Sequence, residues 1–491
     1  MSSKMMLMAN SLTHVRPLTC AAAAVYPSRL VAQPPDLIKW VKTEGGFVHK
    51  SIKVAQGDTF GLGLVASEDI PKGSDLIALP QHIPLKFDGS TSESENSHSA
   101  LIKLAQHVPG KVVLSQYRLA FEYLIKGVNW KLGAFGRGAV GYEIGFEASA
   151  RESEERFVLV AIHQQSPRDL LSADFLPWRG YKELAVNKRC RFLLDFEKIL
   201  KHELENLKPD DHPFSGQDVD SSALGWAMSA VSSRAFRLYG GKRPDGTRSN
   251  VPMMLPLIDM CNHSFDPNAE IVQEEANTNR NMLVKMVAGR EIKQNDPLLL
   301  NYGCLSSDLF LLDYGFVIPS NPYDCIELKY DAALLDAASM AAGFTSPNFS
   351  SPSPWQQQIL SHLNLDGPNS DLKVTLGGGE LVEGRLLAAL RVVLSNDEEA
   401  VKQHDLETLK SLTVEAPLGI STEVSALRTV VALCVIALGH FPTKIMEDKS
   451  LLKQNVSPTT ELALQFRIQK KSLIVDVMRD LSKRVKLLLA K

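Results

Sequence analysis

Hydrophobic and polar residues alternate in the same way in two distant parts of the chain. Residues 65–77 and 287–299 share Val, Ala, Ile and Leu at matching positions. Each copy has a turn residue near its middle, Gly73 in the first and Asn295 in the second, and both residue types tolerate a positive φ. Each copy therefore predicts a strand, a tight turn and a second strand. Because the copies lie more than 200 residues apart, we expect a large insertion within a strand-rich core.

The insertion shows helical spacing instead. Two stripes of apolar residues recur at intervals of three and four, which predicts two helices, the second ending at Gly240-Gly241. The stripes consist of Leu114, Tyr117, Phe121 and Leu124, and of Leu224, Met228, Val231, Ala235 and Leu238. The second predicted helix also carries Arg234 and Arg237.

Helical spacing continues after Tyr330 to the end of the chain. The apolar stripes there are Leu386, Leu390 and Val393, then Val424, Leu427, Val431 and Cys434. Ser457-Pro458 predicts the start of a long final helix, because Ser is a good N-cap and Pro suits the first helical position. The pattern therefore predicts a separate all-α domain over residues 325–491.

Composition narrows the class of protein. A chain of 491 residues suggests two or three domains, and 53 basic against 56 acidic residues give a net charge of −3. This balance provides no general attraction to nucleic acid or to anionic membranes, and the apolar stretch 430–438 is too short for a membrane span. The six cysteines include no pair at CxxC spacing, so we expect neither a zinc site nor a disulfide scaffold.

The N-terminus has the composition of a targeting segment. Its first 35 residues contain no Asp or Glu, but they contain Lys4, Arg16, Arg29, several hydroxyl residues and the run Ala21–Ala24. This pattern is typical of an organelle transit peptide, here over residues 1–40. The serine and alanine content favours the chloroplast stroma over the mitochondrion. The alternative is a disordered N-terminus on a cytosolic protein.

Three short motifs adjoin the repeated unit and carry the candidate chemistry. They are Gly61-Leu62-Gly63, Asn262-His263-Ser264 and Asn301-Tyr302-Gly303. In this order, with Ser233-Arg234-Ala235-Phe236 before the second motif, the chain resembles SET-domain methyltransferases of the Rubisco large-subunit methyltransferase type. The resemblance implies an α+β fold, in which a β-rich pseudoknot core spans 48–316 with a helical insertion at about 90–240. It also implies that the C-terminal helical domain binds the substrate.

The same resemblance assigns roles to individual residues. It implies S-adenosylmethionine as the cofactor, no metal, and Tyr302 as the central catalytic hydroxyl. The cofactor-binding residues that it implies are Gly61, Leu62, Gly63, Arg234, Asn262, His263, Tyr302 and Tyr314. The substrate-binding residues that it implies are Arg234, Phe236, Asp259 and Tyr302.

The sequence departs from the family pattern at three places. Phe60 stands where relatives often have an acidic residue, and Leu238 stands where Rubisco-type enzymes have an arginine. The usual Ser-Asn after the tyrosine motif is Ser307-Asp308 here. The zinc cysteines that follow the SET domain in histone methyltransferases are absent, which disfavours a nuclear chromatin enzyme.

These observations favour a monomeric lysine methyltransferase that acts on a non-histone plastid protein. Two alternatives stay open. One is methylation of histidine, which some relatives of the same architecture carry out on actin. The other is a catalytically weak scaffold or assembly factor in a plastid complex, which Phe60 favours.

Overall fold

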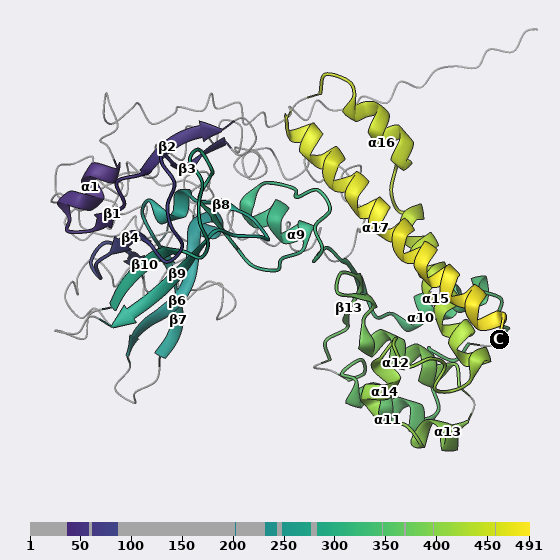
Figure 1. Ribbon diagram of the computed structural model, residues 1–491. Coiled ribbons are helices and arrows are strands. Elements are labelled where there is room, and N and C mark those ends of the chain that lie inside the picture. The colour runs from purple at the N-terminus through teal and green to yellow at the C-terminus, as the bar shows by residue number, and fades with distance from the viewer. Residues whose placement is uncertain are drawn as a thin grey trace, which may run out of the picture.

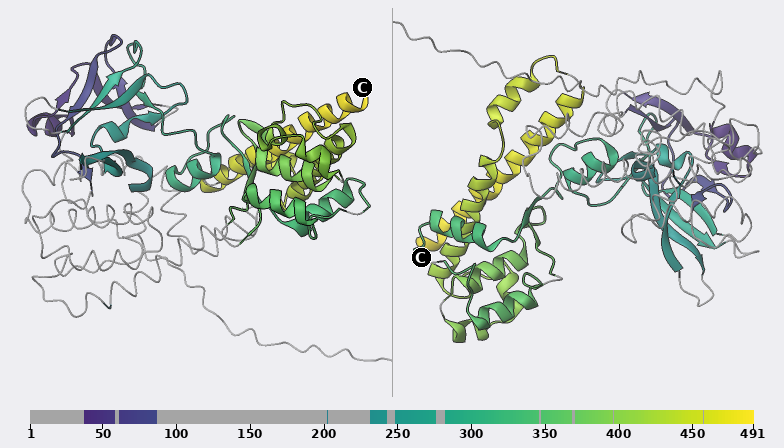
Figure 2. Two further views of the ribbon diagram at one scale, coloured as in Figure 1. Left: turned by 90° about the horizontal axis from the view of Figure 1, so that it is seen from below. Right: turned by 180° about the vertical axis from the view of Figure 1, so that it is seen from behind.

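The computed structural model describes residues 37–57, 61–86, 202, 231–242, 248–275, 282–345, 347–367, 370–395, 397–456 and 458–491. The described residues form a strand-rich lobe and a helical lobe, which are separate in all views (Figures 1 and 2). The predicted helix containing Leu114, Phe60 and residues 1–36 of the predicted transit peptide lie outside the described residues. The predicted boundary at residue 40 requires correction, because Leu37 and Trp40 belong to a described helix and are buried in the core.

Small antiparallel sheets build the strand-rich lobe. The largest has the order β1 (Phe47–Val48), β4 (Asp75–Leu79), β10 (Met282–Ala288), β9 (Ala269–Glu275). The others are the hairpin of β2 (Ile52–Gly57) with β3 (Gly61–Ala66), and the sheet of β5 (Leu85–Lys86), β7 (Arg248–Met254) and β6 (Ala235–Lys242). The helix α1 (Leu37–Thr43) packs its buried face on the same apolar core.

The two copies of the repeated pattern pair with each other about a local pseudo-twofold axis. The axis passes between Ile70 and Ile292, which exchange both backbone hydrogen bonds at 2.8 and 2.9 Å. The bond from the Gly73 N–H to the Ala288 carbonyl is repeated by the bond from the Asn295 N–H to the Ala66 carbonyl, each at 2.8 Å. Gly73 (φ 82°) and Asn295 (φ 68°) both have positive φ, as predicted. The prediction of strand, turn and strand is therefore confirmed for both copies.

The predicted helix ending at Gly240-Gly241 is wrong from Ala235 onward. The chain is helical over residues 231–234 and then extended in β6, which pairs with β7. Side chains in β6 alternate, because Phe236 and Leu238 pack against the core whereas Arg237 and Tyr239 are exposed. This period of two is the strand signal that the wider helical spacing of Val231, Ala235 and Leu238 concealed. Gly240-Gly241 lies at an irregularity of the ladder, between Tyr239 and Lys242.

Helices dominate the second lobe, as predicted. They are α10 (Ala332–Ala341), α11 (Pro354–His362), α12 (Gly384–Val393), α13 (Glu398–Lys402), α14 (Leu406–Lys410), α15 (Ile420–Gly439), α16 (Ile445–Leu452) and α17 (Pro458–Leu489). The predicted stripes of α12 and α15 face one buried apolar core, and α17 begins at the predicted proline. Among the described helices, α15 alone has the length and hydropathy of a membrane span, and 56% of that stretch is buried inside the lobe.

The all-α description of this lobe requires one correction. A three-stranded antiparallel sheet, β12 (Ile326–Lys329), β13 (Lys373–Gly377) and β14 (Glu380–Val382), precedes α12. Ile326 and Leu328 point into the core and alternate with polar residues, which is a strand pattern. The sheet adds a β element beside the predicted helices.

Candidate functional site

Two of the three motifs meet where short strands lie parallel. The strand β8 (Asn262–His263) pairs with β11 (Leu299–Leu300), and the Ser264 N–H donates to the Leu300 carbonyl at 2.9 Å. These segments come from either side of the large hairpin formed by β9 and β10. The pairing brings His263 next to the segment that contains Tyr302.

The glycine motif approaches the same point from β3. A Cβ atom at Gly63 would lie 2.6 Å from the Asn262 side-chain nitrogen and 3.5 Å from the Met260 carbonyl oxygen. Only glycine allows this approach without moving the Asn262 amide. Gly61 and Leu62 precede it on the same strand, opposite Gly57 and Gln56. The structure thus brings all three predicted motifs together.

Tyr302 is held at both its backbone and its hydroxyl. Its N–H donates to His263 Nδ1 at 3.1 Å. Its hydroxyl donates to the backbone carbonyl of Cys261. Cys261 follows the 3-10 turn η2 (Ile258–Met260) and directly precedes the Asn262-His263-Ser264 motif. This hydrogen bond therefore links the tyrosine motif to the start of the histidine motif. The orientation of this hydroxyl is fixed by main-chain atoms, which is what a positioned catalytic group requires.

Aromatic side chains surround Tyr302 and His263. The Tyr314 ring stacks on the Tyr302 ring, with centroids 5.1 Å apart and an interplanar angle of 22°. The Phe310 ring lies 4.8 Å from the His263 ring, and Phe265 meets His263 edge-on at 4.7 Å. These rings form a wall of low polarity beside the central hydroxyl.

A π-helix places two of these rings. The short helix α9 (Ser307–Leu309) continues directly into the π-helix η3 (Phe310–Tyr314), which ends at Gly315 with φ 78°. The i→i+5 winding offsets side chains relative to an α-helix, and such turns are frequent at functional sites. Here Phe310 and Tyr314 reach His263 and Tyr302 from the same turn.

His263 is a neutral imidazole in this setting. Burial lowers its pKa to about 4, and Nδ1 accepts the Tyr302 N–H, so the ring proton is on Nε2. Nε2 is buried and has no hydrogen-bond partner among the described residues. Burial and the nearby Asp313 carboxylate raise the pKa of Tyr314 to about 12, so its hydroxyl is protonated near neutral pH.

Asp259 lies on η2, two residues before Cys261. Burial raises the pKa of its carboxyl to about 6, against the opposing effect of the Arg234 guanidinium. Arg234 donates to the Asp259 backbone carbonyl at 3.0 Å, and the carboxyl Oδ1 has no partner within the described part of the chain. Leu257, just before η2, has φ 73°, which is rare for a leucine. The strained turn therefore fixes the position of a buried carboxyl and of the Cys261 carbonyl.

Sequence reasoning missed part of this arrangement. It did not assign a role to the Cys261 carbonyl, because a backbone atom leaves no composition signal. It also missed Phe265 and Phe310, although both lie within five residues of a predicted site residue. Phe236, predicted to contact substrate, is half-buried against the apolar core of the lobe.

Comparison with known families agrees with this geometry. The SET domain family matches residues 61–303, and the Rubisco LSMT substrate-binding family matches residues 348–474. The chain belongs to the LSMT-like SET-domain protein methyltransferases. Its SET domain contains the crossing of β8 and β11, and its LSMT substrate-binding domain contains α11 to α16.

Individual relatives are distant but similar over nearly the whole chain. The actin-histidine N-methyltransferase of Gallus gallus is 22% identical over 91% of this chain and 68% of its own length. The chloroplastic [fructose-bisphosphate aldolase]-lysine N-methyltransferase of Arabidopsis thaliana is 23% identical over 94% of this chain and 85% of its own. The solved SET domain of LSMT bound to lysine and AdoHcy superposes with a TM-score of 0.58 at 17% identity, covering 92% of this chain and 91% of that one.

Proposed function

We propose that the protein transfers a methyl group from S-adenosylmethionine to the side-chain amine of lysine in a non-histone protein of the chloroplast stroma. The observation that carries the proposal is the hydroxyl of Tyr302, fixed on the Cys261 carbonyl and stacked on Tyr314 where the three motifs meet. The relatives that methylate lysine or histidine support the reaction class.

The residues at the crossing fit S-adenosylmethionine. Gly63 lets the Asn262 amide pack directly against the β3 backbone, and His263 and Asp259 each present a buried polar atom without a partner among the described residues. The cofactor supplies a methyl group activated on a positively charged sulfur. We assign its binding to the Gly61-Leu62-Gly63 strand, Asn262 and His263, with Arg234 close behind.

Tyr302 would orient the acceptor amine. Its O–H proton is donated to the Cys261 carbonyl, and a hydroxyl oxygen that donates its proton in this way can also accept an N–H bond from an amine. Hydrogen bonds from the amine to two acceptors would fix the direction of the nitrogen lone pair. A lone pair held in line with the methyl carbon at near-attack distance lowers the barrier of the displacement.

The aromatic wall would favour the reactive form of the amine. A free lysine titrates near pH 10.4, so at neutral pH its amine is protonated and has no lone pair to react. The Phe316 ring contacts the Phe310 and Tyr314 rings of the aromatic wall and so extends its surface of low polarity beside Tyr302. Removal of water disfavours the ammonium ion and lowers the pKa of a lysine entering here.

Histidine is the second candidate acceptor. It is favoured by the similarity to actin-histidine N-methyltransferases over 91% of the chain. An imidazole requires no deprotonation near pH 7, so it makes less use of the apolar wall. We favour lysine because a solved relative holds lysine in this fold and because an aldolase-lysine methyltransferase matches more of both chains.

The helical lobe would bind the protein substrate. It contains the region that matches the Rubisco LSMT substrate-binding family. A stromal location is supported by the acid-free N-terminal segment and by the chloroplastic relative. The stroma is therefore the first place to look for the acceptor protein.

The test has two stages. The full chain and its Asn262→Ala variant are titrated calorimetrically with S-adenosylmethionine, and we expect micromolar binding that the substitution weakens. The protein is then incubated with S-adenosylmethionine bearing a deuterated methyl group, using stromal extract, purified aldolase and purified actin as acceptors. Mass spectrometry of the peptides is expected to find the label on lysine. Label on histidine would establish the second candidate, and a folded chain without cofactor binding would support the scaffold alternative.

A further inference from the structure

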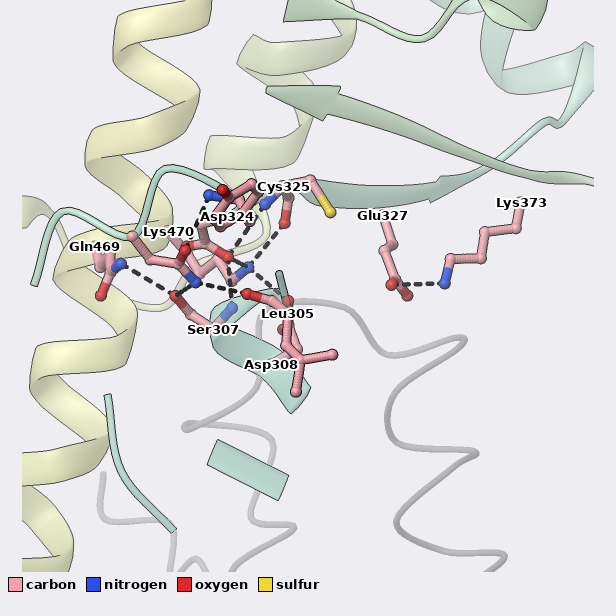
Figure 3. Close-up of polar contacts among 11 residues, drawn as sticks. Leu305, Ser307, Asp308, Asp324, Cys325, Glu327, Lys373, Gln469 and Lys470 are labelled. Atoms are coloured by element: carbon pink, nitrogen blue, oxygen red, sulfur yellow. Dashed lines mark hydrogen bonds and ion pairs between the residues drawn. The ribbon is translucent and has the colours of Figure 1, made fainter. Parts of the chain in front are cut away.

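A buried lysine from the helical lobe holds the segment that carries the aromatic wall. Lys470 lies on α17, and its side chain is only 3% exposed. Its ammonium contacts the carboxylates of Asp308 and Asp324 and donates to the Cys325 carbonyl at 2.7 Å (Figure 3). The two carboxylates are 4% and 3% exposed, so the cluster is dry.

Neighbouring residues extend the same connection. Gln469 donates to Ser307 Oγ at 3.0 Å, and Asp324 accepts the Ser307 backbone N–H at 2.9 Å. Asn321 donates to Ser307 Oγ and to the Leu305 carbonyl. Figure 3 shows these groups converging from α17, α9 and the segment before β12. The N-terminal end of α9 is thereby fixed on α17.

The position of this end of α9 determines the position of the Phe310 and Tyr314 rings on η3. Asp308 is two residues before Phe310, and η3 follows without interruption to Tyr314. A shift of the first turn would carry the Phe310 ring away from His263 and the Tyr314 ring away from Tyr302. Asp308 also stands where the family pattern has Asn, and here its added negative charge meets the Lys470 ammonium.

The cluster is sensitive to the loss of any member. Burial lowers the pKa of Lys470, and the nearby Asp324 carboxylate opposes that shift. Removing the ammonium would leave two carboxylates facing each other in a dry site, which is unfavourable for both. The segment would have to move to rehydrate them.

We propose that Lys470 is a positioning residue, which fixes the 307–314 segment on α17 so that Tyr314 stacks on Tyr302 beside the proposed amine site. Its role in catalysis rests on the proposed function. Its role in placing the wall is a statement about structure alone. The helical lobe thus controls the placement of the Phe310 and Tyr314 rings beside His263 and Tyr302.

Hydrogen exchange of the full chain tests the placement directly. In Lys470→Met we expect the amides of residues 310–316 to exchange about ten times faster or more, because local opening no longer breaks the ion cluster. The matched control is Lys471→Met. Lys471 is the next residue of α17 and is equally buried, but its ammonium contacts Asp448 and Thr443 beside α16. That variant is expected to loosen α16 and to leave residues 310–316 unchanged.

A neutral variant covers the case in which Lys470→Met does not fold. Combining it with Asp308→Asn and Asp324→Asn removes every charge of the cluster. The triple variant then buries no unpaired charge, so it is expected to fold more readily than Lys470→Met alone. Faster exchange of 310–316 is expected there too. Equal effects of Lys470→Met and Lys471→Met on this segment, or no effect of either, would overturn the proposal.

Kinetics and cofactor titration separate this inference from the proposed function. With the acceptor found by the labelling experiment, Lys470→Met is expected to lower kcat about 100-fold, as small misplacements do, with little change in KM. A loss confined to KM would contradict the positioning role. If the wild type bound no S-adenosylmethionine, the proposed function would fail while the exchange experiment still decided the placement.

Discussion

A buried cluster of the helical lobe and a buried pair of the SET lobe differ in how their polar atoms are satisfied. In the helical lobe, Arg391 is fully buried and forms a two-point ion pair with Glu423 at 2.7 and 2.8 Å. Its other N–H groups bond the carbonyls at the end of α14 and just beyond. In the SET lobe, Asp259 Oδ1 and His263 Nε2 are buried without a partner among the described residues. The Arg391 cluster thus satisfies its buried charges internally, whereas Asp259 and His263 each keep one buried polar atom unsatisfied by the described residues.

The largest expected effect tests the satisfied Arg391 cluster. Arg391→Met leaves Glu423 buried without its cation and removes donors from several carbonyls. We expect a loss of about 3–5 kcal/mol in the free energy of unfolding, measured by urea denaturation of the full chain. The control Lys402→Met removes exposed ion pairs with Glu398 and Glu399, which water and salt screen, and should leave the stability nearly unchanged. A small effect of Arg391→Met would remove the contrast between the lobes.

The second effect concerns function instead of stability. Tyr302→Phe removes one fixed hydroxyl, and we expect kcat for methyl transfer to fall about 100-fold. The free energy of unfolding should change by only about 1 kcal/mol, because one hydrogen bond to Cys261 is lost. The control is Tyr330→Phe in the helical lobe, whose buried hydroxyl has no partner among the described residues and no assigned role. Near-normal turnover by Tyr302→Phe would exclude the central hydroxyl from the reaction.

The third effect is a pH dependence of stability. The pKa of His263 is about 4 in the folded protein and about 6.5 when unfolded, so the unfolded chain binds a proton first as pH falls. Stability from this group is complete above pH 6.5 and is lost between pH 6.5 and 4. His263→Asn should flatten the unfolding profile in that window by about 2 kcal/mol, which is less than the full pKa difference would give because the ring is only half-buried. An unchanged profile would show that the imidazole is accessible to water and protons.

The smallest effect is at the glycine motif. Gly63→Ala puts a methyl group 2.6 Å from the Asn262 amide, so that flexible side chain must move. We expect S-adenosylmethionine to bind about tenfold more weakly by calorimetry, which corresponds to about 1.4 kcal/mol, with little loss of stability. Gly289→Ala, where the nearest atom is 3.8 Å away, is the matched control. Equal affinities of both variants would place the cofactor away from β3.

The sequence was informative where local pattern and local structure agree. The repeated unit predicted strand, turn and strand, and Gly73 and Asn295 have the positive φ that their residue types favour. The stripes of α12 and α15 gave their buried faces, because a helix packed on one core has an apolar side. The order of the motifs led to the site, since each motif is a continuous stretch of chain.

Prediction failed where two patterns overlapped or where a partner was distant. The alternation of Phe236 and Leu238 was hidden by a helical spacing that used the same residues. The sheet of β12 to β14 was missed for a similar reason, because its strands are short and lie between helices. The contact of Lys470 with Asp308 joins residues 162 positions apart, and nothing in either local sequence indicates it.

The pseudo-twofold pairing also sets an order for folding during synthesis. The hydrogen-bond partners of Ala66, Ile70 and Gly73 are Asp296, Ile292 and Ala288, so the first copy leaves the ribosome long before its partner exists. Contacts of such long range slow folding and leave strand edges exposed in the meantime. The helical lobe, whose helices follow one another along the chain, has no such delay. A nascent chain stalled before residue 287 is therefore expected to depend on chaperones, whereas one that has passed residue 300 can close its core.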